Sequence, residues 1–416
     1  MILGDIMDRV VMHIDVNNAF LSWTAIYLLN NGYKYDIRNS YAVIGGDEKN
    51  RTGIVLAKSS SAKKMGIYTS ETLFSARKKC PALKSYPPNY SFYVEMSNKL
   101  FDLLGKYTPD IEVASVDECY LEYSGVKGLY GDELEFAKKI QKEIYDTLGF
   151  TVNIGIANNK LCAKMASDFE KPNKIHTLYS YEVENKMYPL EVGDLFGIGK
   201  MTAKKLNELG IKTIGELANT DLYFLSRYFK NQAIAMINSA KGIDNSLVIS
   251  ESEELKGISN EITLDHDVSS KKELAQHFLY LSDKVTRRLR KSNKYAFVVA
   301  IILKDKYFKR ITRQKKLKNA TNVTDEIYDV AKSILEEMEE IEPVRLVGLR
   351  LTNLVDKSER QVSLFDNIEL HDNDENLDKT VDMLKEKFGS NIVKKASLVD
   401  VADKKRLEKD SNSKFS

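Results

Sequence analysis

The chain lacks paired cysteines, a long apolar run and a signal peptide, and each absence excludes a class of protein. Its three cysteines, Cys80, Cys119 and Cys162, form no Cys-x-x-Cys pair and have no histidine cluster beside them, so neither a disulfide framework nor a zinc site is predicted. No apolar run approaches the roughly 20 residues that cross a bilayer. The N-terminus carries early acids and no small-residue cleavage site. We therefore expect a cytoplasmic protein without membrane association.

The composition is otherwise that of an ordinary globular protein. Its 416 residues are 43% apolar and 29% charged, which predicts about two to four domains with sizeable cores. The net charge is only +2, but residues 284–318 hold fourteen Lys or Arg and a single acid, Asp305. Aromatic side chains interleave with this basic block. That mixture favours a folded surface for nucleic acid over a merely solvated charged face.

The first 175 residues alternate between strand and helix patterns, which predicts a βαβ-like arrangement around a small sheet. An apolar run at 10–14 ends at Asp15, and helical spacing follows over 19–29. A helix is also predicted over 134–148 and another from about Lys160. Further strands are predicted at 41–44, 53–57, 111–116, 119–123 and 151–157.

The rest of the chain divides into a helical region, a linker, a second α/β pattern and a tail. Residues 178–243 are predicted to be helical, and the polar stretch 244–257 is predicted to be a linker. Strand, helix, strand, strand, helix and strand patterns between 258 and 352 predict a βαββαβ domain. The tail, 357–416, holds one apolar peptide, 361–366, and ends in about a dozen residues that we expect to be disordered. It also holds an amphipathic helix with one apolar stripe: Leu377, Val381, Leu384 and Phe388.

Three acids stand where predicted strands end, and they suggest metal chemistry. Asp15 follows the first strand, and the adjacent pair Asp117 and Glu118 follows a later one. Hard divalent ions prefer oxygen ligands, and two such ions stabilise both oxygens of a phosphoryl transfer. Neighbouring side chains of a strand face opposite ways, so Asp117 and Glu118 can converge only where the strand turns. The alternative is that these are ordinary solvated acids at strand ends.

Six segments in a fixed order carry a resemblance to a known family. They are HIDVNNAF (13–20), SSAKKMGI (60–67), ASVDECYL (114–121), IGIANNKL (154–161), AKMASD (163–168) and KPN (171–173). The set resembles the DinB/UmuC (Y-family) DNA polymerases, and the resemblance extends over about residues 10–400. The Ser-Val-Asp-Glu and Asn-Lys-Leu-x-Ala-Lys-x-Ala-Ser segments are its most specific parts.

The resemblance implies an α+β, right-hand polymerase with a palm, fingers, a helix-hairpin-helix thumb and a βαββαβ little finger. It implies template-directed DNA synthesis on primer–template DNA from deoxynucleoside triphosphates, in translesion synthesis and DNA repair. No separate segment is available for a proofreading nuclease, so low fidelity is expected. The implied boundaries are palm 1–18 and 84–177, fingers 19–83, thumb 178–243, linker 244–257, little finger 258–356 and tail 357–416.

Residue roles at the active centre follow from the same resemblance. Asp15, Asp117 and Glu118, with the carbonyl of Val16, are implied to hold two Mg²⁺ ions, with Mn²⁺ as an alternative. Phe20 stands where the family has the ring that collides with a ribose 2′-hydroxyl, although it could be simply a core aromatic. Lys160 is implied to contact the triphosphate.

This chain departs from the family pattern at several nucleotide-binding positions. Lys63 stands where Arg is usual, and Ser60 stands where a Tyr is usual, so fewer donors face the triphosphate and the bidentate contact is lost. Asn17 replaces a common second acid, and Ala19 replaces an aromatic. Weaker nucleotide binding is expected rather than loss of activity.

DNA and protein contacts are implied outside the active centre. The Gly-Ile-Gly turn at Gly197 and Gly199, followed by Lys200, resembles a helix-hairpin-helix whose backbone N–H groups bind a DNA phosphate. In the basic block, Arg310 and Arg313 are predicted to contact DNA, and such binding should be salt-sensitive. Residues 361–366 resemble a peptide that binds the bacterial sliding clamp through Gln361, Leu364 and Phe365.

Two other functions remain open from the sequence, and a monomer is expected in every case. The chain could be a polymerase-fold recruitment subunit without catalysis, as Ser60, Lys63 and Ala19 would permit, although it retains all three acids. It could also be a helix-hairpin-helix DNA-binding protein, but that function would not explain the acids.

Overall fold

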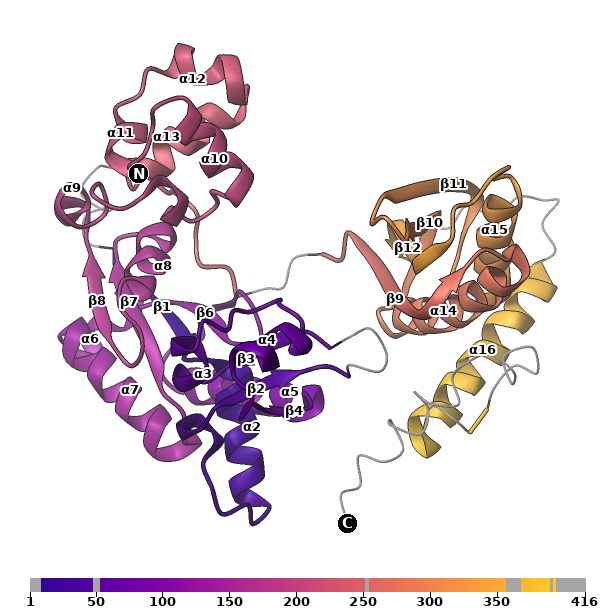
Figure 1. Cartoon of the computed structure of the whole chain (residues 1–416), viewed down its shortest axis with the longest axis horizontal. Coiled ribbons are helices and arrows are strands. Elements are labelled where there is room, and N and C mark those ends of the chain that lie inside the picture. The colour runs from indigo at the N-terminus through magenta and orange to yellow at the C-terminus, as the bar shows by residue number, and fades with distance from the viewer. Residues whose placement is uncertain (1–8, 48–52, 251–253, 357–367, 390–391, 394–416) are drawn as a thin grey trace. The chain divides into compact units, whose positions relative to one another are not determined.

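The computed structural model describes residues 9–47, 53–250, 254–356, 368–389 and 392–393. The described chain divides into two compact units, one made of residues up to 250 and the other of residues from 254 onward. Figure 1 shows the element order. Among the described residues, no helix is long and apolar enough to cross a membrane. Residues 361–366 and the last dozen residues, for which predictions were made, lie outside the described ranges.

The first unit is built on a five-stranded sheet in the order β5-β6-β1-β7-β8. The central strand β1 runs antiparallel to both neighbours, and β8 runs parallel to β7. The strand bounds are β1 Val11–Val16, β5 Ile111–Val113, β6 Glu118–Glu122, β7 Val152–Ala157 and β8 Ile175–Leu178. Each strand pattern predicted here from the sequence is observed, with β5 three residues shorter than expected.

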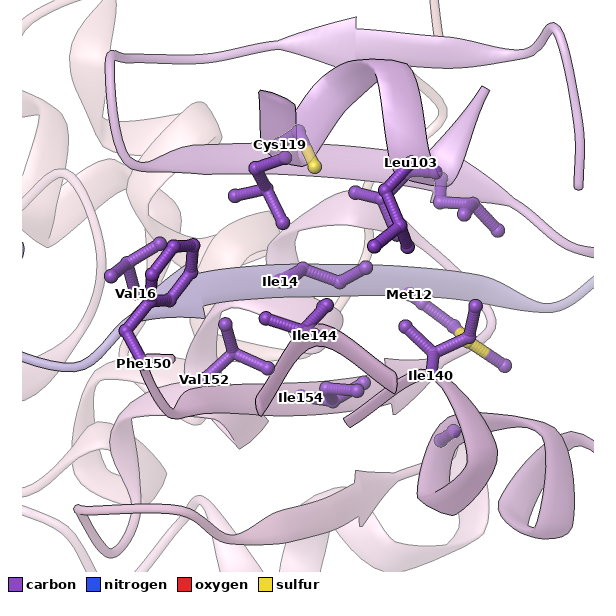
Figure 2. Packing of buried hydrophobic residues seen from close by; sticks show 14 of the residues in the cluster. Met12, Ile14, Val16, Leu103, Cys119, Ile140, Ile144, Phe150, Val152 and Ile154 are labelled. Carbon is purple, nitrogen blue, oxygen red and sulfur yellow. The ribbon is translucent and has the colours of Figure 1, made fainter. Parts of the chain in front are cut away.

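One face of this sheet is an apolar core under α5 (Tyr90–Leu104) and α7 (Glu133–Leu148). Figure 2 shows Met12 and Ile14 of β1 packed beside Ile154 of β7, with Leu103 of α5 and Ile144 of α7 against them. Every second residue of a strand points to the same face, so the even-numbered side chains of β1 enter this core. The odd-numbered residues His13 and Asp15 consequently face the other side.

Helix α8 (Lys160–Asp168) covers that other face. Its backbone comes so close to β7 that a Cβ on Gly155 would lie 2.0 Å from the carbonyl oxygen of Ala163. Glycine is therefore required at this position for packing. The close approach brings the side chains of α8 onto the polar face of the sheet, beside His13 and Asp15.

The same unit contains a smaller, three-stranded sheet in the order β3-β2-β4. Strand β2 (Ala42–Gly45) pairs antiparallel with β3 (Val55–Lys58) and parallel with β4 (Lys84–Tyr86). The third strand of this sheet, β4, thus comes from residues that the sequence assigned to the palm. The helices beside it are α2 (Ala19–Asn30), α3 (Ser60–Lys64) and α4 (Leu73–Lys79), with the 3₁₀ turn η1 at Ile37–Asn39.

A compact group of short helices follows β8, as predicted for 178–243. Its members share an apolar cluster with α8, to which Leu206, Leu217 and Leu225 contribute. The bounds are α9 Val183–Lys186, α10 Lys200–Glu208, α11 Ile214–Ala218, α12 Leu222–Phe229 and α13 Gln232–Ala240, with 3₁₀ turns at Ser180–Glu182 and Val192–Asp194. Two further short elements, Ser124–Val126 and Lys127–Tyr130, precede α7.

The second unit confirms the predicted βαββαβ order. Its sheet has the order β11-β10-β12-β9, with all pairs antiparallel, and α14 and α15 cover one face (Figure 1). The bounds are β9 Gly257–Val268, α14 Lys271–Lys291, β10 Lys294–Asp305, β11 Arg310–Thr321, α15 Thr324–Glu336 and β12 Val344–Asp356. Strand β11 extends eight residues beyond the predicted end at Arg313.

A last helix, α16 (Ile368–Phe388), is attached to this unit through charged side chains. Arg290 of α14, with a side chain 4% exposed, donates to Asp382 at 2.7 Å and to Asp378 at 3.0 Å. Lys385 bonds Asp283 of α14 at 2.6 Å. The predicted apolar stripe instead points outward, with Leu377 and Phe388 about three-fifths exposed. The helix is amphipathic as expected, but its polar side is the attached one.

Candidate active site

Two of the three predicted metal-binding acids, Asp15 and Glu118, lie side by side on the polar face of the five-stranded sheet, and Asp117 lies close enough for their charges to act on it. Asp15 on β1 stands opposite Glu118 on β6 and Asn153 on β7, in register across three strands. Asp117 lies one residue before β6, and its carbonyl oxygen accepts a hydrogen bond from Val16 N–H at 3.0 Å. The strand begins at Glu118, so Asp117 occupies the turn that lets two adjacent acids converge.

Two lysines that the sequence analysis quoted without a role neutralise these acids. Lys171 Nζ bonds Asp15 Oδ2 at 2.8 Å and Asp168 at 2.8 Å. Lys164 Nζ, almost fully buried on α8, lies 3.3 Å from Asp15 Oδ2 and 3.1 Å from Glu118 Oε1. Although burial alone would lower the pKa of Lys164, the charges of Asp15, Asp168 and Glu118 raise it, so its ammonium form is favoured.

The acids differ in how well they are compensated. Contact with His13, followed by the charge and hydrogen bond of Lys164, lowers the pKa of Glu118 to about 2. Burial raises the pKa of Asp117, and the charges of Asp15 and Glu118 raise it further, against a 2.7 Å hydrogen bond from Ser115 Oγ. Asp117 is thus the acid that gains most from an added cation.

His13 is a buried part of the site that lay within a quoted motif but was given no role. Its Nδ1 is 2.8 Å from Ser167 Oγ, and its Nε2 is 3.5 Å from Glu118 Oε2. Burial lowers its pKa. Its position beside Asp15 follows from strand alternation, but its contact with Glu118 required the pairing of β1 with β6.

The donor set suits a hard divalent cation. Asp15, Asp117 and Glu118 supply only oxygen ligands from neighbouring strand ends. In the side-chain arrangement described, no three acidic, His or Cys groups are close enough together to hold a metal ion. The ammonium groups of Lys164 and Lys171 occupy carboxylate oxygens that a metal would need. A cation at these acids would therefore compete with the two lysines for Asp15 Oδ2 and Glu118 Oε1.

Phe20 lies at the start of α2, half-buried among other aromatic rings. Its ring stacks on Tyr93 with centroids 4.7 Å apart and meets Tyr90 edge-on at 6.2 Å. Tyr93 in turn bonds Thr24, one helical turn after Phe20. Asn18 lies between β1 and α2 in a left-handed conformation with φ of 51°, and its side-chain amide donates a hydrogen bond to the carbonyl of Lys58. The Phe20 ring, two residues after Asn18, is thus held rigidly by its aromatic neighbours.

Ser60 and Lys63 are both exposed on the short helix α3, which Ser59 caps at its start. In the contacts observed, neither side chain pairs with a carboxylate. Lys58, on the preceding strand, was missed by sequence analysis. Burial, followed by the nearby charge of Lys63, lowers the pKa of Lys58. A pair of mutually repelling cations therefore stands where the sequence suggested that phosphate donors were depleted.

Lys160 begins α8, but its ammonium group already has partners. It bonds both carboxylate oxygens of Glu112, at 2.6 and 2.7 Å, and lies over the ring of Tyr120 at 5.0 Å. Glu112 was not identified from the sequence, because a lone glutamate in a short strand carries no signal. Only the register of β5 against β6 places it there.

The predicted DNA-contacting residues lie on three elements. Gly197 adopts a positive φ of 90°, Gly199 stands at the start of α10, and Lys200 is its first, exposed residue. Arg310 is opposite Lys304 and Arg313 is opposite Ile301 in the β10–β11 pairing. Being three residues apart on a strand, Arg310 and Arg313 point to opposite faces of the second sheet.

Acids at adjacent strand ends, a covering helix with cationic residues, and a Gly-Ile-Gly helical hairpin are the features that the sequence led us to expect of a right-hand nucleotidyltransferase. Comparison with known families narrows the class. The impB/mucB/samB family matches residues 14–168, its C-terminal domain matches 255–364, and its helix-hairpin-helix motif matches 182–211. The chain belongs to this family, the Y-family DNA polymerases.

Relatives and solved structures agree with that assignment. The chain is 44% identical over 399 residues to DNA polymerase IV of Clostridium acetobutylicum, covering 96% of this chain and all of the relative. It is 33% identical to DNA polymerase IV 1 of Bacillus subtilis, covering 98% of this chain and 97% of that one.

Among solved structures, a Y-family DNA polymerase chimera covers 83% of this chain and 99% of its own, with a TM-score of 0.74 and 25% identity. DinB of Sulfolobus solfataricus has the same coverage, with a TM-score of 0.55 and 26% identity. The fold, the enzyme class and the translesion function expected from the sequence are thereby confirmed. The chain is a DNA-directed DNA polymerase, so the two non-catalytic alternatives are set aside.

Proposed function

We propose that this polymerase transfers nucleotides at Asp15, Asp117 and Glu118, which together with the Val16 carbonyl would hold two divalent cations, Mg²⁺ or Mn²⁺. When bound, such ions supply positive charge to the attacking and leaving oxygens. The reaction joins a primer 3′-hydroxyl to the α-phosphate of a template-paired deoxynucleotide and releases pyrophosphate. The convergence of the three acids on one sheet face carries the proposal.

The protein's own residues position and balance charge in this scheme. Asp15 and Glu118 are fixed by their places in paired strands, so little reorganisation is needed at the moment of reaction. Lys164 and Lys171 compensate the acids until cations arrive and thus keep the site folded. Lys160 would contact the triphosphate, and Ser60 and Lys63 would line its path.

Phe20 would exclude ribonucleotides by contact with the sugar. The rigidity of the Phe20 side chain supports this role. The ring is stacked on Tyr93 and cannot turn aside without breaking that stack. Phe20→Ala should raise the ratio of ribonucleotide to deoxynucleotide incorporation. An unchanged ratio would assign the gate to another residue.

Gly197, Gly199 and Lys200, with Arg310 and Arg313, would hold the DNA backbone without reading sequence. We further propose that Gln361, Leu364 and Phe365 bind the sliding clamp. This proposal rests on the sequence of the peptide and on its position in a polar segment. Leu364→Ala combined with Phe365→Ala should abolish clamp binding and leave clamp-independent synthesis intact. Unaltered clamp affinity would reject it.

The test of the catalytic proposal is extension of a labelled primer with Mg²⁺ and deoxynucleotides by the wild-type enzyme and by Asp117→Asn. We expect extension by the wild type and none by the variant. Equal extension by both would remove Asp117 from the reaction. DNA binding measured on the same samples shows whether the variant still engages its substrate.

A further inference from the structure

The ammonium group of Lys160 has no hydrogen-bond donor to spare. An ammonium has three N–H donors. Two of those of Lys160 meet the carboxylate of Glu112 at 2.6 and 2.7 Å, and the third faces the carbonyl oxygen of Leu247 at 3.4 Å. The Lys160 side chain is only 15% exposed. A triphosphate oxygen could therefore bind Lys160 only by displacing one of these partners.

Glu112 is held at this place by the sheet. It stands opposite Tyr120 on β6, which stands opposite His13 on β1, so the three side chains form a cross-strand row. The neighbouring row, two residues along the same face, contains Asp15 and Glu118. The ion pair of Glu112 with Lys160 thus lies beside the acid cluster, with the ring of Tyr120 between them.

Glu112 has a second partner, the chain that leaves the helical group after α13. Its Oε2 accepts the backbone N–H of Ile249 at 2.9 Å. The sequence predicted residues 244–257 to be a linker, but residues 244–250, which we call the post-thumb strap, are fixed to the five-stranded sheet and α8. Further anchors are Leu161 N–H to Asp244 at 3.1 Å, Arg9 to the Ser246 carbonyl at 2.9 Å, and Ser250 Oγ to the Pro109 carbonyl at 3.0 Å.

Polar contacts attach most of this strap, and Val248 packs against the apolar cluster shared by α8 and the short helices. The side chains of Leu247 and Ile249 are 60% and 56% exposed, although both residues bond the Lys160–Glu112 pair through their backbone. Hydrogen bonds of this kind exchange readily with other polar partners. A change in the partner of Lys160 would therefore alter the contacts of the strap at Leu247 and Ile249.

We propose that Glu112 competes with the incoming triphosphate for Lys160, and that nucleotide binding is thereby coupled to release of the post-thumb strap. The carboxylate neutralises a lysine that the polyanion needs, and it repels the polyanion itself. When Lys160 turns to phosphate, the Leu247 carbonyl loses its donor, and the Glu112 carboxylate, left without its counter-ion beside a polyanion, is repelled and gives up the Ile249 N–H. Coupling is reciprocal, so release of the strap strengthens nucleotide binding by the same factor.

This inference rests on the proposed role of Lys160 and is tested with a dideoxy-terminated primer, which allows nucleotide binding without reaction. The dissociation constant of a correct deoxynucleoside triphosphate is measured for the full chain on primer–template DNA. Glu112→Gln, which keeps the size and removes the charge, should tighten it by roughly three- to tenfold. Unchanged or weaker nucleotide affinity in Glu112→Gln would overturn the proposal.

A double-mutant cycle separates the inference from the proposed function. Lys160→Met should weaken nucleotide binding, and adding Glu112→Gln to it should then have no further effect. If Lys160→Met leaves the affinity unaltered, the triphosphate role of Lys160 itself fails. If Glu112→Gln tightens binding equally with and without Lys160, its effect is general charge repulsion and the competition is rejected.

A matched control and a direct readout of the strap complete the test. Glu95→Gln removes a glutamate that is also paired with a lysine, Lys99, but on the exposed surface of α5, and it should leave nucleotide affinity unchanged. In the wild type, hydrogen exchange of the Ile249 amide should accelerate severalfold when nucleotide binds. Exchange that is unaffected by nucleotide would show that strap and nucleotide are not coupled.

Discussion

Two clusters of buried charge, one in each compact unit, are made of similar groups but are balanced differently. In the first unit, Lys164 and Lys171 face Asp15 and Glu118, and Asp117 is left with the hydroxyl of Ser115 and two negative neighbours. In the second unit, Arg290 bonds both Asp378 and Asp382. Each cluster has one acid more than cations, but Arg290 bonds both of its acids, whereas Asp117 is hydrogen-bonded by a neutral hydroxyl.

The difference appears in the pKa values of two acids. Burial and like charges raise the pKa of Asp117. Burial alone would also raise that of Glu375 on α16, but hydrogen bonds from Lys379, Tyr295 and Asn322 lower it to about 2. Buried charge by itself therefore does not mark a functional site. An acid that the fold leaves uncompensated is a candidate for one, because a bound ion or substrate would supply the missing charge.

The largest expected effect is at the uncompensated acid. Asp117→Asn should reduce primer extension by more than about 10³-fold, because charge at the reacting centre is lost. Thermal stability should stay the same or rise, since repulsion by Asp15 and Glu118 is relieved. Extension rates and melting temperatures of the same preparations check both parts. A large loss of stability would mean that Asp117 is structural.

The converse is expected at the balanced cluster. Arg290→Met leaves two buried carboxylates without their cation and should destabilise the second unit by about 3 kcal/mol. The matched control is Lys291→Met, which removes an α14–α16 ion pair of the same kind, with Glu386, whose side chains are 82% and 71% exposed. That change should cost less than about 1 kcal/mol. Denaturant unfolding measures both, and equal costs would contradict the distinction.

A smaller effect is expected when a compensating lysine of the first cluster is removed. Lys171→Met removes the shorter of the two ammonium contacts to Asp15 Oδ2 and should tighten Mn²⁺ binding by about threefold to tenfold, since the ion then competes with one ammonium fewer. Electron paramagnetic resonance of free Mn²⁺ measures this without turnover. Lys174→Met, which removes an exposed lysine paired with Glu170, is the control and should change nothing. Weaker Mn²⁺ binding in Lys171→Met would show that Lys171 supports the ion site.

The smallest effect is a pH dependence of opposite sign in the two clusters. The lowered pKa of Glu375 means that the unfolded chain binds the extra proton, so its contribution is present above about pH 4.5 and is lost as the pH falls towards 2. The raised pKa of Asp117 means that the folded chain binds the extra proton, so stability falls as the pH rises above 3.8.

Comparison of wild type with Glu375→Gln and with Asp117→Asn across this range isolates the two contributions. The contribution of Glu375 should be on the order of 1 kcal/mol after solvent screening, and that of Asp117 should have the opposite sign. Stability differences of the same sign for both variants would contradict the assignment.

Much of the fold was predictable from the sequence because its elements obey simple periodicities. The strands around Asp15 and Glu118 and the βαββαβ order beyond residue 257 follow from alternation and helical spacing. The acids were identifiable because motif order is a sequence property. Contacts such as Glu112 with Lys160 were not, because they join residues 48 positions apart through strand register. The attached face of α16 was not predicted either, because it is decided by ion pairs with α14 that form only on folding.

The sequence by itself determined the elements, the family and the three acids, because these depend on local spacing and on residue types in order. Only the tertiary structure decided which charges compensate one another: Lys171 at Asp15, Glu112 at Lys160, and Arg290 under α16. Electrostatic balance depends on distances across strands and helices that meet only on folding. The sequence gives the charge of each residue, but only the folded structure shows whether an opposite charge lies close to it.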